Sequence, residues 1–322
     1  MEKTKLGFGC APILGRVSKR ESLQALKIAY EEGINYFDIA RSYGWGEAES
    51  ILGNFLAENK IPRDRVEITT KFGLVPKNNK LIRLSKNIAR QLINLNPKTK
   101  NLVKSAASKV APKVDFSLDT AKVSIEKSLK SLRTDYIDNL LLHQYDFQNP
   151  PNDITDIFNF LELEKKRGTI KNYGFSTYQS LDLVANFFIT NNLNPDIIQI
   201  PCQISQKQDY ICFKELTQKG TNIIVHSPFN IGKNSTYIFD YLVRSDLLNH
   251  LTNSLNFPIE KTQDIYSVLL AYFKSISSPY AIVTSMFNLS HIRKNKEIID
   301  RPVLTQKQAE LFKKILSEIQ AS

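Results

Sequence analysis

The segment KRESLQALKIAYEEGINYFDIA, residues 19–40, contains a complete helix-to-strand unit. Its first part has helical spacing, with Ser18 in front as an N-cap and Gly33 as a stop signal. Its second part, NYFDIA, is a short and mainly apolar run, as expected for a strand buried on both faces. The segment therefore predicts a helix that leads directly into a buried strand.

Similar apolar runs recur along the chain and alternate with helical stretches. Besides NYFDIA (35–40), the strand-like runs are LGFGC (6–10), EITTKF (67–72), YIDNLLLH (136–143), NYGFST (172–177), IIQIP (197–201), NIIVHS (222–227) and YAIVTS (280–285). Residues 117–132 and 156–168 have helical spacing, and the latter stretch ends at Gly168. Eight such units predict an α/β fold, a (β/α)8 TIM barrel, as a single domain over residues 1–322. An open doubly wound sheet is the alternative, but no G-x-G-x-x-G follows any of the runs.

Four reactive side chains lie at or after the ends of these runs. Asp38, Lys71 and His143 close three of them, and Tyr43 follows Asp38 on the loop SYGWGEAE. In a barrel, the loops after strands build the active site. A carboxylate, a phenol, an ammonium and an imidazole at one rim can move a proton to or from an oxygen near neutral pH, which is the chemistry of carbonyl reduction. The structural alternatives are a helix cap for Asp38, a rim charge for Lys71, a core histidine for His143 and a packing aromatic for Tyr43.

The cysteine content and the hydropathy limit the classes of protein to which this chain can belong. Cys10, Cys202 and Cys212 form no C-x-x-C motif, which favours a reducing cytoplasm and argues against a disulfide scaffold or a bound metal. The N-terminal residues have no apolar core long enough for a signal peptide, and no run of 18 apolar residues occurs. We therefore expect a cytoplasmic protein without a metal.

The net charge of +11 is concentrated in one insertion. Residues 75–114, after the third strand, contain ten Lys or Arg and no acid, which leaves +1 for the rest of the chain. Leu81, Leu84, Ile88 and Leu92 recur there at helical spacing, which predicts short amphipathic helices that form a lid over the barrel mouth.

The basic face of this insertion has three candidate uses. It is simply solvated, it recruits an acidic or phosphorylated small-molecule substrate, or it rests on an anionic membrane surface. Nucleic acid is not expected as a partner, because residues 75–114 contain no aromatic side chain.

Seven motifs in order resemble those of the aldo-keto reductase family of bacterial type. They are GINYFDIARSYGWGEAESILG (33–53), TTKFG (69–73), SLKSLRTDYIDNLLLHQYD (128–146), GTIKNYGFST (168–177), IIQIP (197–201), IIVHSPF (223–229) and SMFNLSHIRKN (285–295). The resemblance implies a catalytic tetrad of Asp38, Tyr43, Lys71 and His143. It further implies hydride transfer from a reduced nicotinamide to a carbonyl carbon, with Tyr43 as proton donor. Lys71 is then expected to lower the pKa of Tyr43, Asp38 to orient Lys71, and His143 to polarise the carbonyl.

The resemblance also implies a set of cofactor-binding residues. Ser176, Thr177 and Gln199 take the positions that hold the nicotinamide carboxamide, His226 the position that stacks on its ring, and Ser227 and Phe229 the turn near the pyrophosphate. The adenosine-phosphate end is assigned to Ser285, Asn288, His291 and Asn295, with Arg293 and Lys294 as candidate charges. Family resemblance favours NADP(H). NAD(H) is the alternative, because Ser285 and His291 stand where the family often has lysine and arginine.

These expectations combine into an NAD(P)(H)-dependent oxidoreductase that interconverts a carbonyl compound and its alcohol. Two other functions are weighed beside it: an NADP(H)-binding regulatory subunit with little turnover, and a Schiff-base aldolase that uses Lys71. Trp45, the only tryptophan, is interpreted either as an apolar wall of the substrate pocket or as a packing residue under the loop.

Overall fold

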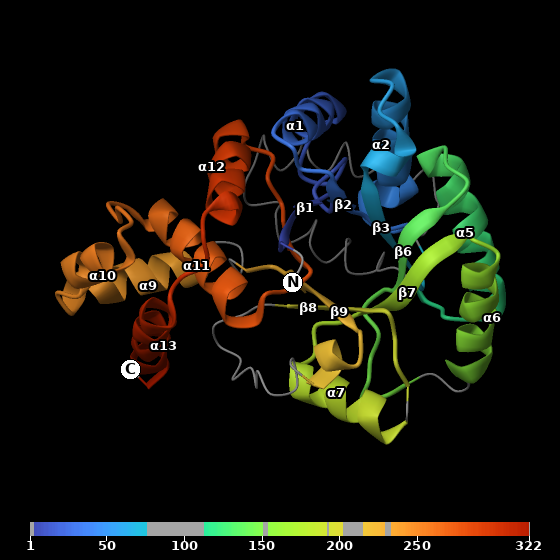
Figure 1. Cartoon of the computed structure of the whole chain (residues 1–322). Coiled ribbons are helices and arrows are strands. Elements are labelled where there is room, and N and C mark those ends of the chain that lie inside the picture. The colour runs from blue at the N-terminus through green and yellow to red at the C-terminus, as the bar shows by residue number, and fades with distance from the viewer. Residues whose placement is uncertain are drawn as a thin grey trace, which may run out of the picture.

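The computed structural model describes residues 3–75, 113–150, 154–191, 193–201, 215–228 and 233–321. Within these ranges, eight parallel strands form a closed barrel (Figure 1). In chain order they are β1 (Lys5–Gly9), β2 (Tyr36–Asp38), β3 (Glu67–Phe72), β6 (Ile137–Leu142), β7 (Ile170–Ser176), β8 (Ile197–Pro201), β9 (Asn222–His226) and β10 (Ala281–Thr284). The ring closes because β1 pairs with both β2 and β10. The predicted (β/α)8 barrel is confirmed, and each predicted run overlaps one barrel strand.

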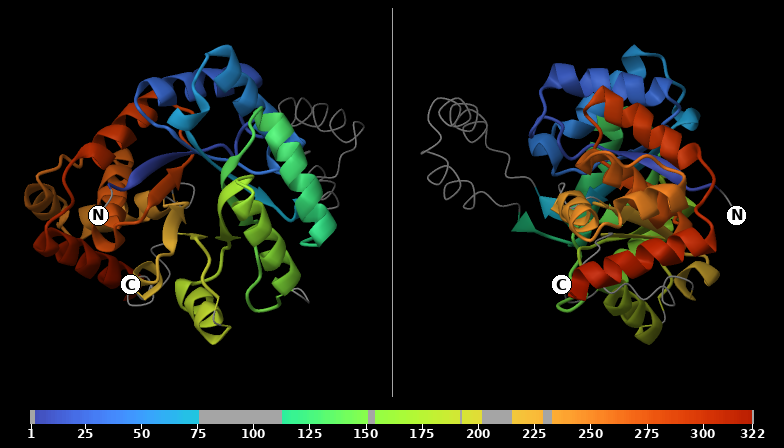
Figure 2. Two further views of the ribbon diagram at one scale, coloured as in Figure 1. Left: turned by 45° about the vertical axis from the view of Figure 1, so that its right-hand side comes forward. Right: turned by 90° about the vertical axis from the view of Figure 1, so that its left-hand side faces the viewer.

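The helices surround the strands, as both views of Figure 2 show. They are α1 (Lys19–Glu31), α2 (Ala48–Glu58), α5 (Leu118–Leu132), α6 (Ile154–Lys166), α7 (Leu181–Thr190), α9 (Lys233–Arg244), α10 (Leu248–Leu255), α11 (Thr262–Ser277), α12 (Leu289–Asp300) and α13 (Gln306–Ala321), with short 3-10 helices η1 (Tyr43–Gly46) and η2 (Arg63–Arg65). Helices α9, α10, α11 and α13 pack on one another at the left of Figure 1. The helical stretches predicted from residue 19, in 117–132 and in 156–168 correspond to α1, α5 and α6.

The predicted ends of the first helix are present. The Ser18 hydroxyl accepts a hydrogen bond from the Glu21 backbone N–H, and the Glu21 carboxylate accepts one from the Ser18 N–H at 2.9 Å. Gly33 has φ +79°, a left-handed conformation that a glycine adopts without strain. The chain therefore leaves α1 and turns into β2 as the sequence indicates.

Alternate strand residues point into the barrel, because side chains on a strand change face at every residue. Tyr36, Leu141, Ile197, Ile224, Ala281 and Val283 form one buried apolar cluster of such residues. Two residues further along β2, β6 and β8, on the same face, lie Asp38, His143 and Gln199. The strand period therefore places polar side chains inside the carboxyl end of the barrel.

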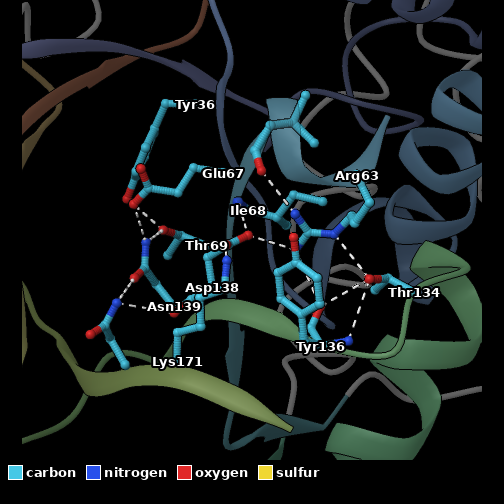
Figure 3. A network of polar contacts seen from close by, with 12 residues as sticks. Tyr36, Arg63, Glu67, Ile68, Thr69, Thr134, Tyr136, Asp138, Asn139 and Lys171 are labelled. Atoms are coloured by element: carbon cyan, nitrogen blue, oxygen red, sulfur yellow. Dashed lines mark hydrogen bonds and ion pairs between the residues drawn. The ribbon is translucent and has the colours of Figure 1, made fainter. Parts of the chain in front are cut away.

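Paired polar groups fill the opposite, amino-terminal end of the barrel (Figure 3). The Glu67 carboxylate accepts hydrogen bonds from Lys5 at 2.7 Å, Asn139 at 2.8 Å and the Tyr280 hydroxyl at 2.8 Å. On the outer face, Asp138 accepts from Arg63 at 2.6 Å, from Lys171 at 2.8 Å and from the Ile68 N–H at 3.0 Å. These contacts bind β3, β6 and β7 together below the site.

The insertion at 75–114 begins and ends in a small antiparallel ribbon. Strand β4 (Leu74–Val75) pairs with β5 (Lys113–Val114), which brings the two ends of the segment together. The sequence did not predict this ribbon, because two residues per strand are too short for a periodic signal. The lid helices expected between them lie outside the described residues.

None of the helices in the described ranges is both long enough and apolar enough to cross a membrane.

Candidate functional site

A buried ion pair lies at the centre of the barrel's carboxyl end. Lys71 Nζ is 2.7 Å from Asp38 Oδ1 and donates a second hydrogen bond to the Ile39 carbonyl at 2.9 Å. The side chains of Lys71 and Asp38 are 1% and 6% exposed. Gln199 Nε2 donates to the other carboxylate oxygen of Asp38 at 2.6 Å. The carboxylate is therefore fixed by an ammonium and an amide at the same time.

Tyr43 lies above this pair on a tightly turned loop. Its ring packs edge-on against the His143 ring, with centroids 5.6 Å apart, and its centroid is 5.3 Å from Lys71 Nζ. The next two residues, Gly44 and Trp45, have φ 55° and 61°, so two consecutive left-handed residues turn the chain after Tyr43. The structure therefore brings all four residues of the predicted tetrad together.

Glu49 anchors this loop, and the sequence analysis did not single it out. Its Oε1 accepts hydrogen bonds from Thr70 at 2.6 Å and from Ser128 at 2.7 Å, and Arg41 pairs with its Oε2. Glu49 thus connects the start of α2 to β3, to α5 and to the segment just before Tyr43. The position of Glu49 within the motif of residues 33–53 could have indicated its importance. Its buried partners Thr70 and Ser128 could not be predicted, because they come from distant segments.

The pKa of Tyr43 differs from the expectation. Burial, followed by the Asp38 carboxylate, raises the pKa of Tyr43 well above 10.0, whereas the sequence analysis expected Lys71 to lower it. The main physical reason is burial, which removes water from around the charged phenolate, and the Asp38 carboxylate, 2.7 Å from the Lys71 ammonium, also offsets part of the ammonium's field. The expected net lowering of the Tyr43 pKa is therefore wrong for this structure, because burial and Asp38 outweigh the attraction of the Lys71 ammonium.

His143 is neutral at physiological pH. Burial, followed by the charges of Lys71 and His226, lowers the pKa of His143 well below 6.5. The Ser42 hydroxyl lies 3.4 Å from His143 Nδ1. A neutral imidazole has one N–H donor and one acceptor, so His143 can present one N–H to a ligand.

A cavity of about 540 Å³ begins at Tyr43 and His143 and extends to α11 and α12. The predicted residues that line it are Asp38, Tyr43, His143, Ser176, Gln199, His226, Ser227, Ser285, His291 and Asn295. Lys71 is buried and does not line the cavity, but it is paired with Asp38, which does. Arg16, Tyr178, Gln263, Tyr266 and Ser267 also line it and were not predicted. Such single polar residues on a loop or a helix carry no pattern in the sequence.

Three other described residues for which a site role was considered, Thr177, Asn288 and Trp45, do not line the cavity. The Thr177 hydroxyl accepts a hydrogen bond from the Gln179 N–H at 3.2 Å, and the Asn288 side chain caps α12 by accepting from the Ser290 N–H at 3.0 Å. Neither Thr177 nor Asn288 lines the cavity. Trp45 is 39% exposed and does not line it either, which leaves its interpretation as a pocket wall unsupported. Phe229 lies outside the described residues.

Of the two candidate charged residues on α12, only one lines the far end of the cavity. Arg293 points to the surface and pairs with Glu32 at 2.7 Å, whereas Lys294 lines the cavity and donates to Asp264 at 2.6 Å. The Ser267 hydroxyl also lines the cavity and is buried without a hydrogen-bond partner in the described part of the chain. A buried hydroxyl of this kind normally has a partner, so a ligand group is expected beside it.

These residues fit a nicotinamide dinucleotide. The cavity connects Tyr43 and His143 at one end with a hydroxyl, an amide and a cation at the other, provided by Ser267, Asn295 and Lys294. Within the described ranges, no group of three or more His, Cys, Asp or Glu is arranged to hold a metal ion.

His226 gives the fold a specific dependence on pH. Its ring packs edge-on against Tyr178, and burial lowers the pKa of His226 from 6.5 to about 4. In the unfolded chain the imidazole binds a proton near pH 6.5, so between that pH and about 4 the unfolded state holds the extra proton. The contribution of His226 to the free energy of unfolding is therefore constant above pH 6.5 and decreases as the pH falls through this window.

We expect His226→Phe to reduce the slope of unfolding free energy against pH in this window, since phenylalanine keeps an aromatic ring but has no titrating group. Urea unfolding of wild type and variant between about pH 5 and about pH 7.5 measures the slope. His250→Asn, at an exposed position, is the control. An unchanged slope in His226→Phe would show that His226 is not held neutral.

Comparison with known proteins agrees with this geometry. Residues 5–317 match the model of the aldo/keto reductase family. The aldo-keto reductase AFTS1 of Alternaria alternata is 32% identical over 157 residues, which are 47% of this chain and 39% of that protein. The L-galactose dehydrogenase of Arabidopsis thaliana is 23% identical over 240 residues, which are 72% of this chain and 63% of that protein. This chain thus spans 39% and 63% of the lengths of these two relatives.

A solved structure shares the fold over almost the whole length. The aldo-keto reductase AKR11C1 from Bacillus halodurans, in its holo form, superposes with a TM-score of 0.69 at 19% identity, covering 99% of this chain and 93% of that one. At this identity the likeness shows the barrel alone. The match over residues 5–317 goes further, and from it we conclude that this chain belongs to the aldo/keto reductase family.

Proposed function

We propose that this protein is an NADP(H)-dependent oxidoreductase that interconverts a carbonyl compound and its alcohol, with Tyr43 as the proton donor in reduction and the acceptor in oxidation. Family membership supports this class of reaction. The observation that carries the proposal is the joint placement of Tyr43 and His143 on one cavity wall above the buried Asp38–Lys71 pair.

When bound, the reduced nicotinamide supplies a hydride to the carbonyl carbon. Tyr43 then supplies the proton for the oxygen. The raised pKa of Tyr43 keeps its phenol protonated at neutral pH. Proton transfer to the oxygen remains downhill, because an alkoxide is a much stronger base than a phenolate.

His143 orients the substrate oxygen. The Ser42 hydroxyl lies 3.4 Å from His143 Nδ1, and in the tautomer in which it donates to Nδ1 the ring proton is on Nε2 and is left to donate to the carbonyl oxygen. A neutral donor holds this oxygen without competing with Tyr43 for the transfer, since the imidazole N–H is a far weaker acid than an imidazolium. His143 therefore polarises the carbonyl and leaves the proton to Tyr43.

Lys71 and Asp38 provide a fixed charge pair beneath Tyr43. As a phenolate forms on Tyr43, the ammonium of Lys71, 5.3 Å from the ring centroid, stabilises it. Gln199 donates its Nε2 to Asp38, so its Oε1 is the atom left to accept from a carboxamide N–H. This refines the carboxamide role expected for Gln199.

NADP(H) is proposed over NAD(H), because Lys294 adds a cation to the end of the cavity opposite Tyr43. A 2′-phosphate would compete with Asp264 for the Lys294 ammonium. Fluorescence titration with NADPH and NADH tests the preference, and tighter binding of NADH would contradict it.

The placement of Lys71 speaks against the Schiff-base aldolase. Its Nζ is buried, donates to Asp38 and to a backbone carbonyl, and does not line the cavity, so a substrate carbonyl has no path to it. The test of the proposed reaction is oxidation of NADPH in the presence of a panel of aldehydes. Absence of turnover with every aldehyde, together with normal cofactor binding, would favour the regulatory subunit instead.

A further inference from the structure

Arg16 is a cavity-lining cation whose guanidinium has no hydrogen bond or ion pair in the described part of the chain. It lies on the loop that follows β1, on the same rim as the ends of β2, β3 and β6. Its exposed side chain lines the cavity that Tyr43 and His143 also line. Arg16 can therefore contact a ligand in the cavity, unlike a cation on the outer surface of the helices.

The backbone around Arg16 is fixed. The Pro12 carbonyl accepts hydrogen bonds from the N–H groups of Gly15 at 2.9 Å, Arg16 at 2.9 Å and Val17 at 3.1 Å. One carbonyl thus holds three consecutive residues in a compact turn. The direction in which Arg16 leaves the backbone is set before any ligand binds.

This loop packs directly on the loop that carries Tyr43. A Cβ placed on Gly44 would lie only 2.9 Å from the Ile13 carbonyl oxygen and 3.3 Å from Leu14 Cβ. Gly44 follows Tyr43, and Leu14 is two residues before Arg16. The loop that carries Arg16 therefore packs beside the loop that carries Tyr43, whereas Lys294 comes from α12.

Among the described residues, Arg16 also adds a positive charge to the cavity. Among the charged side chains that line it, the Asp38 carboxylate is paired with Lys71 and the Lys294 ammonium with Asp264. His143 and His226 are uncharged at neutral pH, because burial lowers the pKa of each. The guanidinium of Arg16 is thus a positive charge that these pairs leave uncompensated, and it attracts anions to the Tyr43 end.

We propose that Arg16 binds the anionic group of the carbonyl substrate, a carboxylate or a phosphate, so that the substrates are aldehyde acids, keto acids or phosphorylated carbonyl compounds. This inference rests on the proposed function. The planar guanidinium forms two parallel hydrogen bonds to such a group, and this fixes the distance between the anion and the reacting carbonyl.

Matched substrates test the proposal. Glyoxylate, succinate semialdehyde and 4-carboxybenzaldehyde are each compared with the methyl ester, which keeps the carbonyl and removes the charge. We expect wild type to prefer the acid of suitable length, and Arg16→Gln to lower kcat/KM for that acid by about 10- to 100-fold while changing the ester by less than about twofold. Arg16→Lys should recover only part of the loss, since an ammonium lacks the planar fork. Arg20→Gln, which removes an equal charge from an exposed position of α1, should leave the acid-to-ester ratio unchanged.

Binding measurements separate the remaining outcomes. If the affinity for NADPH falls in Arg16→Gln, the anion is the cofactor's own phosphate and the proposal is overturned. Equal effects on acid and ester, or no effect on either, overturn it too. If wild type reduces none of the aldehydes, the proposed function fails by itself. In that case, calorimetry compares the affinities of wild type for 4-(hydroxymethyl)benzoate and for its methyl ester. Equal affinities would show that Arg16 does not bind the anionic group.

Discussion

Tyr43→Phe is expected to lower kcat for reduction of a simple aldehyde by about 10²- to 10⁴-fold, the usual contribution of a positioned proton donor. The phenylalanine ring keeps the edge-on contact with His143 and the packing above Lys71. The change thus removes the hydroxyl from the cavity wall and leaves the surrounding packing in place. Steady-state kinetics at saturating cofactor measure the loss.

The control for this variant is cofactor binding. Tyr43→Phe should bind NADPH with nearly wild-type affinity, because the lost hydroxyl acts on the substrate oxygen. Tyr237→Phe, at a 49% exposed position on α9, should retain full activity. Equal kcat values for Tyr43→Phe and wild type would remove Tyr43 from the reaction.

Lys71→Met is expected to lower the free energy of unfolding by about 3–5 kcal/mol, because it leaves the Asp38 carboxylate buried without its ammonium partner. Both side chains are almost fully buried, at 1% and 6% exposed, so water compensates the lost ion pair only poorly. Turnover should fall as well, since the phenolate that forms on Tyr43 loses the nearby charge. Urea denaturation measures the stability, and NADPH oxidation measures the turnover.

A second substitution distinguishes charge from packing. Asp38→Asn combined with Lys71→Met removes both charges, and the double variant should recover a large part of the stability lost in Lys71→Met without recovering activity. Lys3→Met breaks a surface pair whose side chains are 60% and 43% exposed, and it should change stability by less than about 1 kcal/mol. If the double variant is no more stable than Lys71→Met, the buried charge is not the cause.

The strand positions and the tetrad were predictable from sequence, because one pattern determines both. Unbroken apolar runs mark the strands, and the period of two then places Asp38 on the same face as Tyr36, and His143 on the same face as Leu141, inside the barrel. Tyr43 lies on a loop without periodicity and was singled out by its position five residues after Asp38, and the resemblance added its expected role as proton donor.

Electrostatics and local capping were not predictable in the same way. The sequence indicates that Lys71 lies near Tyr43, but it does not give the 2.7 Å distance at which Asp38 cancels the ammonium. The Asn288 side chain caps the first turn of α12, a contact that depends on backbone geometry. Arg16 and Ser267 are single residues on a loop and a helix. No sequence pattern indicates that the fold places them at the cavity.

The most direct test of the central claim follows the hydride. Wild-type protein is incubated with an aldehyde and NADPH that carries deuterium at the transferable position of the nicotinamide, and the alcohol is analysed by mass spectrometry and NMR. We expect one deuterium on the carbinol carbon with wild type and a strongly reduced yield of the same product with Tyr43→Phe. An alcohol without deuterium, or no alcohol from any aldehyde despite cofactor binding, would contradict it.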